Sequence, residues 1–426
     1  MNLDNKIKVL WFSNTPANAD EYFNSELKGT GGWLKALDQA LQKHVDLHIA
    51  FYSREDKVFQ YKQSNYYSLK WKNSVISKIK ERYFGVVLDK EDLDRYLLLI
   101  NEVKPDIIHI HGTENPFGCF IPYVKIPVVV SIQGNITVCN QKFLSGFERK
   151  YLRVKNRSFS SLKDFFLARS FLQSFKLFSK MHARELNNLK HVRNIIGRTA
   201  WDRRITSIMA PNSVYYHSDE ILRDSFYDHK WLPIKTSKTI LFTTNGNTIY
   251  KGFETICEAL YELNILGLNY QWHVAGINTS DLIVKVTKMK LKDKYPKEGL
   301  VLLGNLNENE LVAELLKANI YIMPSHIENS PNNLSEAMML GMPCISTFVG
   351  GVGALITDKV DGILIQSGDP WCMAGAILEL INNQDYAIEL GRNARKTAVK
   401  RHNKGEIING LIDIYKHILI EHKNNS

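Results

Sequence analysis

The chain has 426 residues, of which 44% are hydrophobic and 23% charged, and its five cysteines form no CxxC pair. This composition is typical of a globular protein with two or three domains and excludes a disordered chain, a collagen-like chain and a small disulfide scaffold. The scattered cysteines argue against a disulfide framework or a zinc knuckle, so we expect a protein of the reducing cytoplasm. No apolar run reaches the roughly 18 residues of a membrane span, and the first apolar stretch is too short for a signal peptide.

The net charge of +10 comes from one segment. Residues 149–204 hold fifteen Lys and Arg residues against three acidic ones, whereas the rest of the chain holds 39 basic and 41 acidic residues. Phenylalanines recur in this segment at helical spacing, and a basic amphipathic helix is typical of contact with anionic lipid. Two interpretations stay open: a helix on an anionic membrane surface, or an ordinary helix with a core face and solvated lysines. Because no nucleic-acid fold signature accompanies the charge, we expect no nucleic-acid partner.

Apolar strand-like runs alternate with helix-period segments along the whole chain. They predict strands over residues 7–12, 45–52, 106–111, 127–132, 239–244, 271–275, 299–303, 320–323 and 343–347. Strands separated by helices indicate βαβ units with parallel sheets, and ligands bind such sheets at the carboxyl ends of the strands. The two blocks of strands predict an α/β fold of two facing Rossmann-like domains. We expect an N-terminal domain over 1–212, a C-terminal domain over 213–400, and a last helix within 401–426 that crosses back to the first domain.

The most informative segment follows the predicted strand 320–323 and reads PSHIENSPNNLSEAM. Ser330 fits a helix N-cap and Pro331 the first helical position, so the free amides of a helix start, with the positive end of its dipole, suit a phosphate. Glu328 lies in the loop and Glu336 on the second helical turn, which places two hydrogen-bond acceptors on either side of this anion site. The pattern predicts a ligand with phosphate in the middle and hydroxyl groups at both ends, as in a nucleotide sugar.

This segment resembles the E-x7-E signature of retaining glycosyltransferases of family 4, which have the GT-B fold. The likeness continues into GGVG at residues 350–353 and DGIL at residues 361–364, and it is strong over 239–380. The resemblance implies that Glu336 holds the ribose hydroxyls of the donor, while Glu328 and the amides after it bind the donor sugar and the diphosphate. The donor-binding candidates in this segment are Ser330, Pro331, Asn332, Asn333 and Glu336.

A second anchor, GNTIYKGF at residues 246–253, lies between a predicted strand and a helix. Lys251 is placed to neutralise the diphosphate, where negative charge grows as the leaving group departs; a lysine that caps a loop is the alternative. Relatives often carry arginine where this chain has Asn247, which is a further donor-binding candidate but leaves the diphosphate without one charge-assisted contact. Arg198, in the block IGRTAWDR that some bacterial relatives share, is the candidate to supply it.

The first domain contributes weaker signals. Gly31 and Gly32 match the family's glycine loop after the first strand, although a simple helix start also explains them. His111 ends a strand that resembles the family's D-x-x-H-x-H pattern, and a structural histidine is the alternative. Gln133 replaces the histidine of the T-x-H-G motif; glutamine can hydrogen-bond a sugar hydroxyl but cannot act as a base. In retaining transfer the departing phosphate oxygen can itself accept the acceptor's proton.

The sequence therefore predicts a retaining glycosyltransferase that moves a sugar from a UDP or GDP donor to a hydroxyl of a glycan or lipid-linked acceptor in cell-surface polysaccharide synthesis. The catalytic candidates are Lys251, Glu328, Gln133 and His111. We expect no cofactor and no metal ion, because a lysine and a helix N-terminus supply the positive charge. The expected location is the cytoplasm, with possible attachment to the inner membrane face. The alternatives are a non-catalytic sugar-nucleotide-binding partner and another GT-B enzyme such as a nucleotide-sugar epimerase.

Overall fold

The computed structural model describes residues 6–22, 32–71, 90–154, 170–234, 238–268 and 270–425. The chain divides into two compact units: unit 1 comprises Met1–Thr137, Leu177–Leu222 and His402–Ser426, and unit 2 comprises Val138–Lys176 and Arg223–Arg401. This division differs from the expected ranges 1–212 and 213–400, because residues 138–176 group with unit 2 and residues 213–222 group with unit 1. The physical reason is local packing, since the ring of Phe143 lies 5.7 Å from that of Tyr250 within unit 2.

Unit 1 is built around a sheet whose described strands number eight, in the order β3-β4-β2-β1-β5-β6-β7-β8. Neighbouring strands pair in parallel, except that β3 and β4 form an antiparallel pair at one edge. The strands are β1 (Lys8–Ser13), β2 (Asp46–Ser53), β3 (Lys57–Tyr61), β4 (Ser64–Lys70), β5 (Ile107–His111), β6 (Val128–Ser131), β7 (Asn194–Gly197) and β8 (Val214–His217). The chain order reverses between β1 and β5, and such switch points open ligand crevices at the carboxyl ends of the strands.

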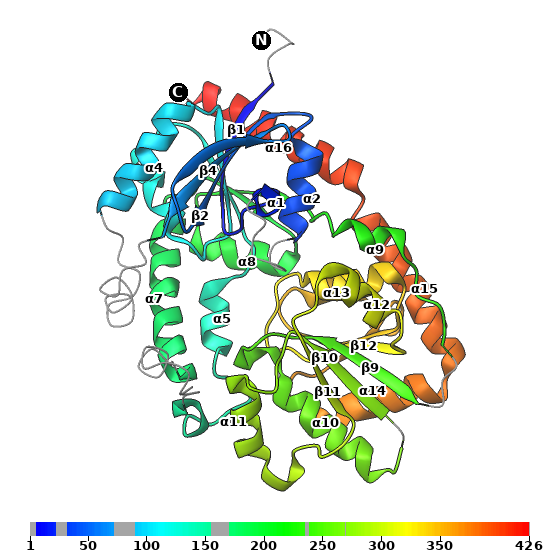
Figure 1. Ribbon diagram of the computed structural model, residues 1–426. Coiled ribbons are helices and arrows are strands. Elements are labelled where there is room, and N and C mark those ends of the chain that lie inside the picture. The colour runs from blue at the N-terminus through cyan, green and yellow to red at the C-terminus, as the bar shows by residue number, and fades with distance from the viewer. Residues whose placement is uncertain are drawn as a thin grey trace. The chain divides into compact units, whose positions relative to one another are not determined.

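Helices cover both faces of the unit 1 sheet (Figure 1). On one face α2 (Gly32–Leu41) and α16 (Lys404–Asn424) contribute leucines and isoleucines to the core. On the other face the core residues come from α4 (Lys90–Val103), the 3-10 helix η1 (Pro116–Tyr123) and the ends of α7 (Phe171–Leu189) and α8 (Ala200–Met209). The central strands are thus buried on both sides, which explains their nearly continuous apolar sequences. Short helices α1 (Ala19–Tyr22) and α5 (Ile136–Lys142) complete the connections.

A buried chain of polar side chains links α16 to the strands of unit 1. The Trp11 Nε1 donates to the Tyr415 hydroxyl at 3.2 Å, and that hydroxyl lies 2.6 Å from Nδ1 of His109. Nε2 of His109 lies 2.6 Å from the Ser131 Oγ. Because an indole nitrogen can only donate, the Tyr415 hydroxyl accepts from Trp11, while the neutral His109 ring donates through one nitrogen and accepts through the other. Burial lowers the pKa of His109 to about 3, which keeps its ring neutral as this assignment requires.

Tyr415→Phe should therefore lower the free energy of unfolding by about 2 kcal/mol, because it leaves two buried nitrogens without partners. Urea unfolding of the two proteins measures this difference. Tyr123→Phe is the matched control, since Tyr123 belongs to the same unit and is 65% exposed. Equal effects of the two substitutions would contradict the role given to the Tyr415 hydroxyl.

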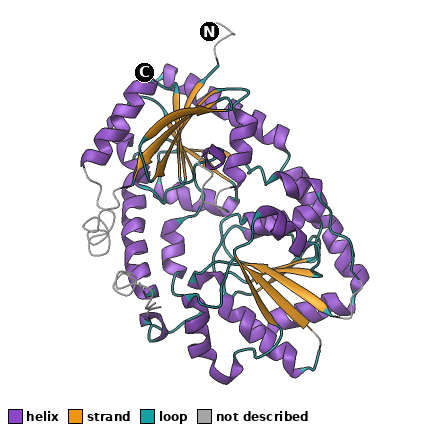
Figure 2. Ribbon diagram, in the orientation of Figure 1, coloured by secondary structure: helices purple, strands orange, loops and turns teal. Residues whose placement is uncertain are grey.

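Unit 2 holds a second sheet in which the described residues form six strands, in the order β11-β10-β9-β12-β13-β14, all paired in parallel (Figure 2). The strands are β9 (Thr239–Thr244), β10 (Tyr270–Ala275), β11 (Leu300–Gly304), β12 (Ile320–Met323), β13 (Cys344–Thr347) and β14 (Ile363–Ile365). The switch point of this sheet lies between β9 and β12.

The helices of unit 2 include those that connect β9 to β10, β10 to β11, β11 to β12 and β12 to β13, as in repeated βαβ units. The unit's helices are α9 (Asp224–Asp228), α10 (Phe253–Ile265), α11 (Leu282–Leu291), α12 (Glu308–Leu315), α13 (Asn332–Leu340), α14 (Pro370–Asn382) and α15 (Gln384–Arg401). Short 3-10 turns occur at η2 (Tyr151–Arg153), η3 (Ile249–Lys251), η4 (Lys292–Lys294) and η5 (Val352–Ala354).

The basic segment 149–204 is partly described, since residues 155–169 lie outside the described residues. Within α7, Phe171 is buried, and the ring of Phe175 lies 5.7 Å from that of Phe143. For these two phenylalanines the packing interpretation is therefore correct, and membrane contact by the segment stays a prediction. None of the described helices combines the length and apolar character that a bilayer span requires.

Candidate functional site

The switch point of unit 2 brings together two predicted residues from separate connections. Lys251 ends η3 after β9, and Glu328 lies in the loop after β12. The Lys251 Nζ lies 2.6 Å from the Glu328 Oε1, which also accepts a hydrogen bond from the Ser325 Oγ at 2.7 Å. Both contacts use Oε1, and no hydrogen bond from the described residues reaches Oε2. The pair therefore presents a cation and a carboxylate oxygen at the carboxyl ends of β9 and β12.

Close backbone packing holds this pair together. Gly252, directly after Lys251, has a φ of +73°, and a Cβ at this position would lie 2.1 Å from the Pro324 carbonyl oxygen. The backbone N–H of His326 donates to the Tyr250 carbonyl at 2.7 Å. Only glycine satisfies both the left-handed conformation and the close approach. The sequence Lys-Gly is thus required for the turn to lie against the loop of Glu328.

The lysine is charged in this setting. Burial by itself lowers the pKa of Lys251, but the adjacent Glu328 carboxylate raises it, and the net result is a pKa above the ordinary lysine value. The ammonium group is therefore kept at neutral and moderately alkaline pH. A retained positive charge can form charge-assisted hydrogen bonds with a phosphate group.

The start of α13 lies beside this pair in the chain. The helix begins at Asn332 with Pro331 in the cap position and no side-chain cap hydrogen bond, so the expectation of Ser330 as N-cap is wrong by one residue. The reason is that Pro331 is extended, with a ψ of 116°, and has not yet entered the helix. The Asn333 side chain donates to the Thr244 carbonyl at 3.0 Å, which ties the helix start to β9. The N–H of Leu334 donates to the Asn333 Oδ1 at 3.0 Å, so the N–H groups of Asn332 and Asn333 are the first-turn amides that can bind an anion.

Glu336, on the second turn of α13, is 5% exposed and is held by a residue that the sequence analysis missed. The Arg223 Nε donates to Oε1 at 2.7 Å and the Arg223 Nη2 to Oε2 at 2.6 Å. These residues are 113 positions apart, and Arg223 belongs to no motif. No pattern in the sequence could have found this pair.

Two predicted donor contacts are engaged in other interactions. The Asn247 Oδ1 accepts a hydrogen bond from the backbone N–H of Ile283, in the first turn of α11, at 3.2 Å. Arg198, in unit 1, forms an ion pair of 2.6 Å with Glu220 and donates to the Gln133 carbonyl at 2.6 Å. The diphosphate contact predicted for Arg198 would require its guanidinium to leave these partners.

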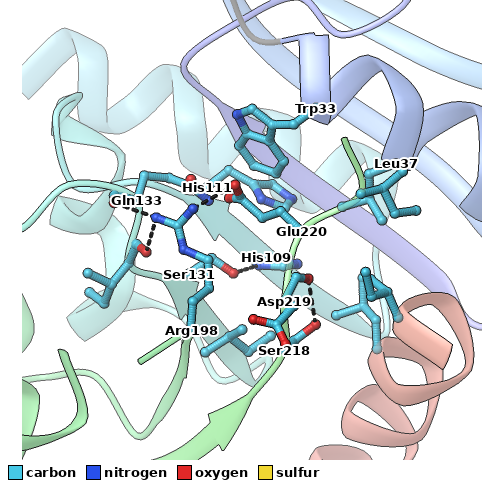
Figure 3. Close-up of a pocket in the computed structure, with 15 residues that line it drawn as sticks. Trp33, Leu37, His109, His111, Ser131, Gln133, Arg198, Ser218, Asp219 and Glu220 are labelled. Carbon is cyan, nitrogen blue, oxygen red and sulfur yellow. Dashed lines mark hydrogen bonds and ion pairs between the residues drawn. The ribbon is translucent and has the colours of Figure 1, made fainter. Parts of the chain in front are cut away.

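Unit 1 contains a narrow pocket at the carboxyl ends of β5 to β8 (Figure 3). Three predicted residues, His111, Gln133 and Arg198, line it together. The ring of Trp33 lies 5.7 Å from that of His111, and Figure 3 shows both near the Arg198 guanidinium. Gly32 is the first residue of α2, directly before Trp33. Gly31 lies outside the described residues.

His111 is a pocket residue with unused hydrogen-bonding capacity. It is 2% exposed, and neither ring nitrogen has a hydrogen-bond partner among the described residues. Burial lowers the pKa of His111, and the neighbouring His109 lowers it further. The ring is therefore neutral at physiological pH, with one donor and one acceptor available to a ligand.

A stability measurement checks this neutral state. The unfolded chain protonates His111 below about pH 6.5 whereas the folded chain does not, so this histidine costs stability as the pH falls. We compare the free energies of unfolding of His111→Asn and the unsubstituted protein. As the pH falls from 7 to 5, this difference should shift by about 2 kcal/mol in favour of His111→Asn. Urea unfolding at both pH values gives the difference. The same gain for His44→Asn, at an exposed position, would contradict the assignment.

Glu114 is a second residue that the sequence analysis missed. It follows β5 at the switch point of unit 1, where its Oε2 accepts from the Asn14 Nδ2 at 2.5 Å and its Oε1 from the Gly134 N–H at 3.4 Å. Burial raises the pKa of Glu114 above its ordinary value. A polar residue directly after a strand at a switch point is the signal that could have identified it.

Comparison with known proteins gives the class to which this geometry belongs. Residues 225–397 match the family model described as glycosyl transferases group 1. Sucrose-phosphate synthase from Thermosynechococcus elongatus has a TM-score of 0.71 at 12% identity and covers 97% of this chain and 100% of its own. HepE from Anabaena, solved with UDP and glucose, has a TM-score of 0.62 at 11% identity, and the match covers 96% of this chain and 99% of HepE. With its two α/β units of parallel strands, the chain has the GT-B fold of glycosyltransferases.

Curated relatives are similar over part of the chain. The N-acetyl-alpha-D-glucosaminyl L-malate synthase of Bacillus anthracis is 30% identical over 120 residues, 28% of this chain and 32% of the relative. The UDP-Gal:alpha-D-GlcNAc-diphosphoundecaprenol alpha-1,3-galactosyltransferase of Escherichia coli is 28% identical over 124 residues, 29% of this chain and 31% of the relative. The matches thus span about a third of the length of these relatives.

Proposed function

We propose that the chain is a retaining glycosyltransferase of family 4 that moves a sugar from a nucleotide diphosphate to an acceptor hydroxyl. One observation carries the proposal: the Lys251–Glu328 pair, 2.6 Å apart, follows two strands at the switch point of unit 2. This pair lies within residues 225–397, the stretch that matches glycosyl transferases group 1. Nucleotides bind α/β sheets at such switch points.

The donor contacts follow from the charges of unit 2. The Lys251 ammonium and the free amides at the start of α13 would bind the diphosphate and stabilise the charge that grows on it as the bond to the sugar breaks. Glu336 would accept hydrogen bonds from the ribose hydroxyls. The unused Oε2 of Glu328 would accept one from the donor sugar. Because Lys251 and the helix start supply positive charge, the proposed reaction needs no metal ion.

The acceptor contacts would come from unit 1. His111 offers a neutral ring with both nitrogens unused, and Trp33 offers an aromatic surface beside it. The side chain of Gln133 adds hydrogen-bonding capacity at the pocket. In the proposed step the acceptor oxygen forms a bond to the anomeric carbon, the bond from that carbon to the phosphate oxygen breaks, and the acceptor's proton passes to the departing phosphate. Neither Gln133 nor a histidine of lowered pKa is then required as a base.

The acceptor class is proposed from charge and likeness. A relative named for transfer to a diphosphoundecaprenol-linked sugar supports a glycan or lipid-linked acceptor for cell-surface polysaccharide. Residues 149–204, with fifteen basic residues, would bind the anionic inner face of the membrane while the enzyme stays cytoplasmic. Flotation with two kinds of vesicle tests this attachment: phosphatidylcholine alone, and phosphatidylcholine mixed with anionic phosphatidylglycerol. If the protein does not bind the anionic vesicles, the proposed attachment is contradicted.

Calorimetry with UDP and GDP tests the function itself. We expect affinity for at least one of them, and Glu336→Ala should weaken it about tenfold or more, the cost of lost hydrogen bonds to hydroxyls. A screen of UDP- and GDP-sugars for transfer and hydrolysis then identifies the donor. No affinity for any nucleoside diphosphate would refute the proposal. Affinity without turnover would instead favour a non-catalytic binding partner, an alternative that the engaged Asn247 side chain supports.

A further inference from the structure

The contact between Arg223 and Glu336 has a geometry that a simple ion pair does not need. Two different nitrogens of one guanidinium donate to the two different oxygens of one carboxylate, at 2.7 and 2.6 Å. The side chains are 19% and 7% exposed, respectively, so both are largely removed from water. A bidentate contact of this kind fixes the plane and the rotation of the carboxylate. Lysine has the charge of arginine but cannot donate to both carboxylate oxygens from two nitrogens held in one plane.

The guanidinium is itself held in place. It lies 4.8 Å from the ring centroid of Phe226, which is fully buried. The segment is anchored to α12, because the Ser225 N–H and hydroxyl both donate to the Glu308 Oε1. Burial lowers the pKa of Arg223, but the hydrogen bonds and charge of Glu336 raise it above the ordinary value. Burial raises the pKa of Glu336, and the hydrogen bonds and charge of Arg223 oppose that rise, so the guanidinium favours the carboxylate form.

This arrangement leaves Glu336 free to accept further hydrogen bonds but not to donate any. A carboxylate has about four lone-pair sites, and Arg223 occupies one on each oxygen. One site per oxygen remains, which suits a pair of neighbouring hydroxyl groups. Without Arg223 the buried carboxylate would lose its compensating charge and tend to bind a proton, which turns an acceptor into a donor.

We infer that Arg223 is a positioning residue that holds Glu336 as a two-oxygen acceptor, and that the site thereby selects ribonucleotides over 2′-deoxyribonucleotides. The inference rests on the proposed function, since it assumes that the nucleotide binds unit 2. It adds a specificity that comes from Arg223 acting through Glu336, with no direct contact between Arg223 and the ligand.

Calorimetry with UDP and 2′-deoxy-UDP, and with GDP and 2′-deoxy-GDP, tests it on the full-length protein. We expect the unsubstituted protein to prefer the ribonucleotide about tenfold or more, as for the loss of one hydrogen bond to a charged group. In Arg223→Lys and Glu336→Gln the preference should fall to less than about twofold, mainly through weaker binding of the ribonucleotide. Arg223→Lys keeps the positive charge, and thermal melting confirms that each variant is folded.

Arg395→Ala is the matched control, because Arg395 donates to the Met339 carbonyl at the other end of α13. This variant should keep the full preference for the ribonucleotide. If Arg223→Lys weakens binding of both nucleotides equally, Arg223 is a structural residue and the inference is overturned. If the unsubstituted protein binds the ribonucleotide and the 2′-deoxyribonucleotide equally well, the inference is overturned. The proposed function is not affected by that result. If neither UDP nor GDP binds, the proposed function fails and the inference fails with it.

Discussion

Lys251→Ala should reduce sugar transfer at least about a hundredfold, which corresponds to about 3 kcal/mol of lost transition-state stabilisation. The substitution removes the ammonium that neutralises the leaving diphosphate. It also leaves the Glu328 carboxylate, 2.6 Å from the lost nitrogen, to repel the phosphates. Steady-state transfer with the donor found in the UDP- and GDP-sugar screen measures the loss, and calorimetry with the free nucleotide separates binding from turnover.

A double substitution separates the loss of the ammonium from the repulsion by the Glu328 carboxylate. Lys251→Ala combined with Glu328→Gln removes the repulsion, so nucleotide affinity should partly return while transfer stays low. Lys290→Ala is the control, because Lys290 forms an ion pair of 3.0 Å with Glu258 in the same unit. Normal transfer by Lys251→Ala, or equal losses in Lys251→Ala and Lys290→Ala, would contradict the role assigned to Lys251.

Gly252→Ala should lower the free energy of unfolding by about 3 kcal/mol or more and weaken nucleotide binding. The new Cβ would lie 2.1 Å from the Pro324 carbonyl oxygen, so the turn that carries Lys251 must move away from the loop of Glu328. Urea unfolding and calorimetry with UDP or GDP measure the two losses.

Gly267→Ala separates steric overlap from backbone strain. Gly267 has a similar φ of +68°, but a Cβ there would meet nothing within 4 Å. We therefore expect it to cost only the left-handed conformation, about 1 kcal/mol, and to leave nucleotide binding unchanged. Similar losses in the two variants would show that the contact with Pro324 is unimportant.

The two units place their candidate residues by one physical rule. In unit 2, Lys251 and Glu328 follow adjacent strands at the point where the chain order reverses, and in unit 1 Asn14 follows β1 and Glu114 follows β5 at the equivalent point. Parallel strands end at the same edge of a sheet, so residues that follow them converge although they are far apart in sequence. The chemistry differs: unit 2 offers a charged pair at a helix start, whereas unit 1 offers a neutral histidine beside an aromatic ring.

Much of this could be predicted from the sequence alone. The nine predicted strands are confirmed with bounds shifted by no more than one residue at either end, and Thr239–Thr244 and Ile320–Met323 match as predicted. Buried parallel strands require uninterrupted apolar runs, and glycine is required where the backbone turns with positive φ, so both features are visible in local sequence. The helix-start pattern and the family resemblance made Lys251, Glu328 and Glu336 candidates, and their roles stay predictions. The strands β3, β4, β7, β8 and β14 were missed because their sequences are short or mixed in polarity.

Only the tertiary structure decided which side chains pair. Arg223 contacts Glu336, 113 positions away in the sequence, and Tyr415 contacts His109, 306 positions away. No sequence motif predicts either contact. The partners of Arg198 likewise depend on how β6, β7 and the segment after β8 lie beside one another. Local sequence determines the conformation of a segment, because backbone geometry and periodicity act over a few residues. The pairing of buried charges depends on packing between distant segments, and no local pattern encodes it.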